Sequence, residues 1–149
     1  MAQSISELTP NALWKNFESL CNIPRPSKKE AKVIEFVIDF AKKHNLEYIK
    51  DEVGNVVIRK PSNKGNGNRT TVILQAHLDM VPQKNAATKH DFEKDPIQPY
   101  IDGEWVKAKG TTLGSDNGIG VSAALAILES TDISHGPIRG HHRTGGWRQ

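Results

Sequence analysis

The most constraining stretch of this 149-residue chain is an apolar run that ends in two polar side chains. Residues 71–76 are rich in β-branched and aliphatic side chains, which favours a strand, and His77 and Asp79 follow. Side chains alternate between the two faces of a strand, so His77 and Asp79 point the same way. Catalytic residues of α/β proteins often lie at the carboxyl ends of strands. The pair therefore indicates either a site at the rim of a sheet or a strand that simply runs out into a loop.

The remaining pattern predicts an α/β fold, a mixed sheet flanked by helices. Apolar residues recur at helical spacing in three segments, and Ser27 with Glu30 forms a capping box that predicts the start of the second helix. Short apolar or alternating runs bounded by turn residues predict strands. The expected helices are 8–23, 27–43 and 121–129, and the expected strands are 46–50, 55–60, 71–76 and 104–108.

The composition is that of an ordinary globular chain, with 36% hydrophobic and 25% charged residues. The apolar runs are too short for a transmembrane helix, and the first residues lack the basic start and apolar core of a signal peptide. The single cysteine, Cys21, excludes an internal disulfide framework and fits a reducing compartment. We therefore expect a cytoplasmic protein that does not bind membranes.

The net charge of +3 does not indicate a nucleic-acid partner, because the excess lies in one short segment. Residues 139–149 hold three arginines and no acidic residue, which leaves 17 basic and 17 acidic residues in 1–138. A neutral body with a short basic end is not the electrostatic footprint of a nucleic-acid binder.

A second polar feature is Asp116, which lies in the glycine-rich segment 110–120. Together with His77 and Asp79 it forms a set of nitrogen and oxygen groups that could share a divalent metal. Asp79 could instead orient the imidazole of His77 through a hydrogen bond, without binding the metal itself. Taken alone, Asp116 is equally compatible with a helix N-cap.

In their order along the chain, these motifs resemble the co-catalytic zinc peptidases of the carnosinase and aminoacylase superfamily, and in particular the aminoacyl-histidine (Xaa-His, or cytosol non-specific) dipeptidases. The resemblance is carried by Ala-His-Leu-Asp-Met-Val-Pro at 76–82, by 103–109, and by Gly-Thr-Thr-Leu-Gly-Ser-Asp-Asn-Gly-Ile-Gly at 110–120. The connector 23–27 and the turn 51–55 fit the same subfamily. The resemblance covers roughly residues 8–138 of this chain.

The resemblance implies a role for each site residue. His77 would bind one metal, Asp79 would orient His77 as a catalytic residue, and Asp116 would bridge two Zn²⁺ ions, with a cis peptide bond before Asn117. Co²⁺ or Mn²⁺ could take the place of zinc. A metal-activated water would hydrolyse a dipeptide substrate, Xaa-His among them, with a glutamate as general base. An intact family member could be a homodimer.

The chain departs from the family after residue 138. The family places a glutamate pair, base and metal ligand, at the end of the next strand, and no glutamate follows Glu129 here. We therefore expect a partial metallopeptidase catalytic domain at 1–138 and an aberrant, disordered basic tail at 139–149, of the kind that truncation or a frameshift produces. The adjacent His141 and His142 could form a metal site, although such pairs in tails are more often incidental.

Three functional hypotheses follow. The chain could be an enzyme whose missing residues come from another chain. It could be a non-catalytic remnant with an unpaired sheet edge and at most a weak, partial metal site. It could also descend from a deacylase or aminopeptidase of the same superfamily, because the substrate pocket would lie beyond residue 138. Alone, the chain is expected to show little or no peptidase activity.

Overall fold

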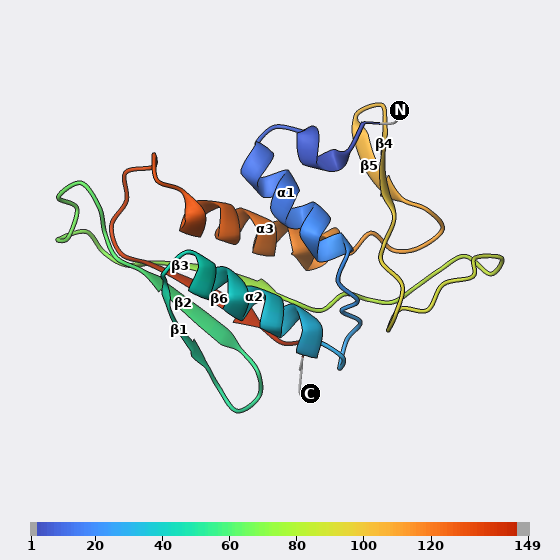
Figure 1. Cartoon of the computed structure of the whole chain (residues 1–149), viewed down its shortest axis with the longest axis horizontal. Coiled ribbons are helices and arrows are strands. Elements are labelled where there is room, and N and C mark those ends of the chain that lie inside the picture. Colours follow the sequence, from blue (N-terminus) through green and yellow to red (C-terminus); the bar gives the residue numbers. More distant parts are fainter. Residues whose placement is uncertain (1–2, 146–149) are drawn as a thin grey trace.

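The computed structural model describes residues 3–145 and shows an α/β fold, which confirms the predicted class (Figure 1). One of its strands, at 138–143, lies almost entirely in the segment for which the sequence predicted a disordered tail. The helices are η1 (Ile5–Glu7), α1 (Asn11–Cys21), α2 (Ala31–Lys43) and α3 (Ser115–Glu129). The strands are β1 (Glu47–Lys50), β2 (Val56–Lys60), β3 (Val72–His77), β4 (Pro99–Asp102), β5 (Trp105–Ala108) and β6 (Ile138–Arg143).

The main sheet is mixed, as predicted, and has the strand order β1-β2-β6-β3. β1 and β2 form the expected antiparallel hairpin, and β6 pairs antiparallel with β2 and parallel with β3. In the β3–β6 register, His77 lies opposite Arg143. β4 and β5 form a separate antiparallel hairpin.

One face of the main sheet is covered by α2 and α3, and no helix among residues 3–145 covers the other face. The buried strand residues alternate with exposed ones, so that Val56, His142 and Ala76 form one covered row across the sheet. Ile49 and Ile73 are about half exposed. The core between the helices and the sheet contains Val33, Val37, Ile58, Leu78, Val121, Leu125 and Ile138.

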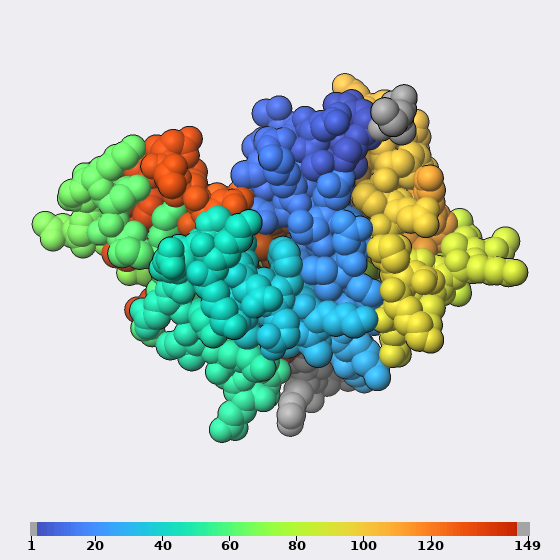
Figure 2. Space-filling view, viewed as in Figure 1, coloured from blue at the N-terminus to red at the C-terminus, as the bar shows by residue number. Residues whose placement is uncertain are grey.

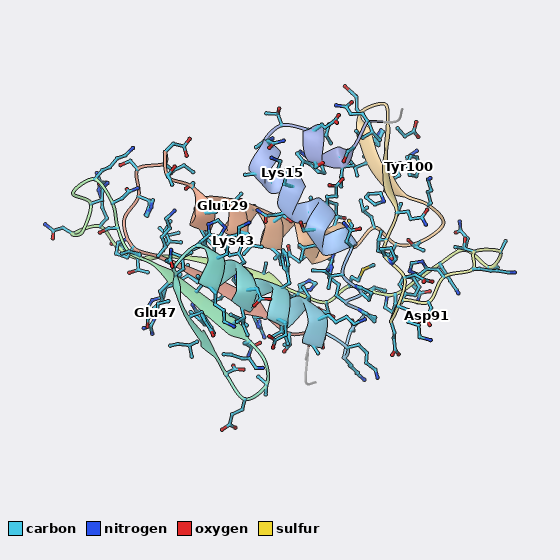
Figure 3. The ribbon with its side chains drawn as sticks, in the orientation of Figure 1. Lys15, Lys43, Glu47, Asp91, Tyr100 and Glu129 are labelled. Carbon is cyan, nitrogen blue, oxygen red and sulfur yellow. The ribbon has the colours of Figure 1, made fainter. Side chains whose placement is uncertain are left out.

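A second apolar cluster joins α1 to η1 and to the β4–β5 hairpin, through Ile5 and Phe17 and, from the hairpin, Ile101 and Val106. The hairpin lies on the far side of the helices from β1, as the labelled side chains of Tyr100 and Glu47 show (Figure 3). The loops at 62–68 and 84–90 project from opposite ends of the molecule (Figure 2). No helix among residues 3–145 is long and apolar enough to span a membrane.

The start of the second helix differs from the prediction. We expected Ser27 to cap it, but the helix begins four residues later, with Glu30 in the N-cap position and no side-chain cap. The Ser27 hydroxyl instead donates to the Asp79 carboxylate. The cap motif failed because Lys28 has a φ of 73°, which lies outside the helical region, so the helix cannot start directly after Ser27.

The expectation of a disordered tail is wrong for residues 139–143, which form most of β6. The side chains gave no strand pattern, but the backbone of β6 pairs with β2 on one side and β3 on the other. Main-chain hydrogen bonds do not depend on the identity of the side chains. Pairing on both edges therefore stabilises β6 as a strand although its side chains have no strand pattern. Residues 146–149 lie outside the described part of the chain.

The covered face of β6 carries His142, which is 1% exposed and has no hydrogen-bond partner at either ring nitrogen among the described residues. Burial lowers the pKa of His142 to about 4, with a smaller contribution from His141. The unfolded chain therefore binds a proton to this ring near pH 6.5 and the folded chain does not, so folding free energy is lost as the pH falls between those values.

We expect His142→Leu to stabilise the protein, because it removes two buried unpaired nitrogens. The difference in unfolding free energy between His142→Leu and the wild type should grow by about 3 kcal/mol from pH 7 to pH 4. Urea denaturation followed by circular dichroism at several pH values measures it. His90→Leu, in a loop, serves as the control, and a pH-independent difference would contradict the prediction.

Candidate metal centre

The end of β3 places His77 and Asp79 on one face, as the alternation of the strand requires. Their side chains meet, with 2.9 Å between His77 Nδ1 and Asp79 Oδ1. The Asp79 side chain is only 11% exposed, and the intervening Leu78 is fully buried in the core. The packed strand end thus fixes the orientation of the His77 ring.

Asp116 approaches the same imidazole from the first turn of α3. Its Oδ1 lies 3.0 Å from His77 Nε2, and its side chain is 94% exposed. The backbone of Asp116 and Asn117 is not helical, and the peptide bond between them is cis, in agreement with the expectation from the resemblance. The structure therefore brings together all three residues that the sequence singled out.

In its neutral form the His77 ring can offer one nitrogen lone pair to a cation. A neutral imidazole has a single N–H, so it can donate to Asp79 or to Asp116 but not to both. With the proton on Nδ1, toward Asp79, the Nε2 lone pair faces a carboxylate oxygen. A metal between Nε2 and Asp116 satisfies both groups, in the carboxylate–histidine–metal arrangement common in metalloproteins. These residues fit one side of a divalent metal site.

Two further residues of the site escaped the sequence analysis. The Ser27 hydroxyl donates to Asp79 Oδ2, which leaves Oδ1 for the histidine. The guanidinium of Arg25 is buried behind the site, where burial lowers its pKa and the charges of Cys21 and Asp79 act in the opposite direction. In the sequence, the one feature that could have pointed to Arg25 is its position between two prolines in a short, otherwise apolar connector.

Residues 138–145, which form β6 and the segment after it, supply no acidic side chain to the site. β6 is the strand that follows α3, and it ends at Arg143, with Thr144 and Gly145 directly after it. His77, Asn117, Arg143 and Thr144 line a pocket of about 220 Å³. Within residues 3–145, no cluster of three or more His, Cys, Asp or Glu side chains could hold a metal ion. The glutamate pair that the resemblance leads us to expect here is absent from the described residues.

The comparisons with known proteins agree with this description. No family model matches the chain. It is 56% identical over 134 residues to the cytosol non-specific dipeptidase of Escherichia coli (strain K12), covering 90% of this chain and 28% of that protein. Its fold matches the aminoacylhistidine dipeptidase of Vibrio alginolyticus with a TM-score of 0.92 and 52% identity, covering 94% of this chain and 29% of that one.

A more distant likeness, to a dinuclear metal-binding peptidase of the M20 family from Bacillus subtilis, has a TM-score of 0.53 at 15% identity and shows the fold alone. It covers 89% of this chain and 35% of that one. The fold of the chain is therefore that of part of these peptidases. In sequence and in fold the chain is similar to the cytosol non-specific and aminoacylhistidine dipeptidases, and it spans less than a third of their length.

Replacing Arg143 by glutamate should strengthen metal binding at His77. The two residues are opposite each other on neighbouring parallel strands, so the change exchanges a cation for a carboxylate ligand beside the ring. We expect the affinity for Co²⁺, measured by titration of its visible absorption, to rise about tenfold in Arg143→Glu.

The matched control is Arg139→Glu, which makes the same charge change on the same strand and face, opposite Ile73. It lies about 13 Å along the strand and should leave the affinity nearly unchanged. An equal gain in both variants would mean that overall charge, and not a new ligand, is responsible.

Proposed function

We propose that this chain contributes one half of a metal centre of a dipeptidase, and that it is incomplete as a catalyst on its own. The observation that carries the proposal is the imidazole of His77, which has a carboxylate at each ring nitrogen. One carboxylate, Asp79, is nearly buried and orients the ring, while the other, Asp116, is exposed and available to a cation. This division of roles is the one expected of a metal site with an orienting acid.

In this proposal His77 Nε2 and an oxygen of Asp116 are the protein ligands of the metal, and Asp79 is the positioning acid. Zinc suits a site of histidine and carboxylate groups, and Co²⁺ and Mn²⁺ are the alternatives. A bound ion of this kind acts as a Lewis acid and activates water for attack on an amide carbonyl. The substrates would be dipeptides, as the names of the dipeptidase relatives suggest.

Two features support incompleteness. Catalytic zinc sites normally use three protein ligands, and the described residues offer two. A general base is also required, and Arg143, Thr144 and Gly145 occupy the end of β6 without providing one. The first alternative is an enzyme completed by residues of another chain. Homodimerisation remains a prediction, and a cytosolic location is proposed from the name of the Escherichia coli relative.

The sequence of β6 supports the proposal that residues 139–149 differ from those of an intact family member. Its inward positions after Ile138 are Gly140 and His142, where a core strand normally places apolar side chains. The Leu128 side chain would lie 2.8 Å from a Cβ built at Gly140. It therefore occupies the space that a larger side chain at residue 140 would need. The nucleotide sequence beyond the Ile138 codon decides whether this segment is read in the ancestral frame.

The proposed function is tested by metal binding and turnover in the full chain. We expect weak binding of Co²⁺, at least tenfold weaker in His77→Ala and in Asp116→Ala, and unchanged in His90→Ala. Hydrolysis of an Xaa-His dipeptide with added Zn²⁺ should stay at the background level.

Equal binding by all four proteins would overturn the assignment of the ligands. Turnover that disappears in His77→Ala would instead establish an enzyme that is active as it stands, or completed by a second copy.

A further inference from the structure

Arg25 is among the most deeply buried side chains of the protein, with 1% of its surface exposed. A buried cation is costly unless it is hydrogen-bonded. Here the guanidinium is held by main-chain carbonyl oxygens, and the nearby Asp79 is the acidic residue whose charge favours the charged form. The location of this charge therefore needs an explanation beyond simple core packing.

The acceptors of Arg25 belong to the two segments that carry the candidate metal ligands. Nη1 donates to the carbonyl oxygens of Leu78 and Asp79, at 3.0 and 3.3 Å. Nη2 donates to the carbonyl oxygen of Gly114, at 2.7 Å. One planar group thus connects the end of β3, next to His77, with the turn that precedes Asp116.

The glycines of that turn make room for the guanidinium. A Cβ at Gly114 would lie 2.6 Å from Arg25 Nη2, and a Cβ at Gly118 would lie at the same distance from it. Gly114 also has a φ of 75°, a conformation that other residues rarely adopt. Two of the glycines in the segment 110–120 are therefore explained by contact with Arg25.

The backbone of the same connector is fixed to the strand end. The Met80 N–H donates to the Arg25 carbonyl at 3.0 Å, and the Ser27 N–H donates to the Met80 carbonyl at 3.2 Å. Since Ser27 also holds the Asp79 carboxylate, residues 25–27 contact both sides of the candidate site. The connector is consequently a rigid support and not only a link between two helices.

We infer that Arg25 is a positioning residue that sets the distance between His77 and Asp116 for metal binding. The metal-binding part of this inference rests on the proposed function, whereas the positioning part concerns the metal-free protein. A lysine at this position keeps the charge but cannot donate in two directions from one plane, so it cannot hold both segments.

The test compares Arg25→Lys with a control that loses a similar contact elsewhere. In the full chain, Arg25→Lys should weaken Co²⁺ binding about tenfold or more. In the metal-free protein, the NOE between the ring protons of His77 and the β protons of Asp116 should be lost. The control is Lys60→Gln, because Lys60 is part-buried and also donates to main-chain carbonyls, those of Ile127 and Ser130, away from the site.

Lys60→Gln should lower the melting temperature but keep both the Co²⁺ affinity and the NOE. If Arg25→Lys keeps the NOE and the wild-type affinity, or if Lys60→Gln loses them equally, the positioning role is refuted. If the wild type binds no Co²⁺, the proposed function fails, and the NOE still decides the positioning role. Should Arg25→Lys fail to fold, Gly118→Ala, which displaces the guanidinium, is measured in the same way with the same expected losses.

Discussion

The main sheet depends on the hydrogen bonds of β6, which lies between the β1–β2 hairpin and β3. Without β6 the hairpin and β3 would have no ladder in common, and α2 and α3 would cover separate pieces of sheet. The strand fills this place with a glycine and an unpaired histidine on its buried face. Its pairing therefore reflects main-chain hydrogen bonding on both edges, which offsets a poor set of side chains.

The same strand determines what the candidate site contains. β6 runs parallel to β3, so its carboxyl end arrives beside His77, and the residues found there are Arg143, Thr144 and Gly145. The part of the site built by β3 and α3 is well ordered, through the contacts of Asp79 and Arg25. The part that β6 would supply has a cation where a metal centre needs an anion. An organised half-site next to a strand end without an acidic residue fits both the similarity to the dipeptidases and the proposed incompleteness of the site.

Most of the fold and the three candidate site residues could be predicted from local patterns. The alternation of β3 placed His77 and Asp79 on one face, and the glycine-rich segment pointed to a constrained Asp116; the roles of these residues remain predictions. Arg25 and Ser27 could not be assigned in this way. The carbonyl acceptors of Arg25 are 53, 54 and 89 residues away in sequence, and no local periodicity indicates such contacts. β6 was missed because it is stabilised by hydrogen bonds to the backbone of its neighbouring strands. Its own side chains have no pattern that predicts a strand.

The central claim is that His77 and Asp116 are the protein ligands of one metal ion. X-ray absorption at the zinc edge of the zinc-loaded full chain tests this most directly. The account predicts a single imidazole nitrogen at about 2.0–2.1 Å among oxygen ligands, and loss of the imidazole contribution in His77→Ala. An imidazole contribution of the same size in His77→Ala would place the metal on another histidine and contradict the account.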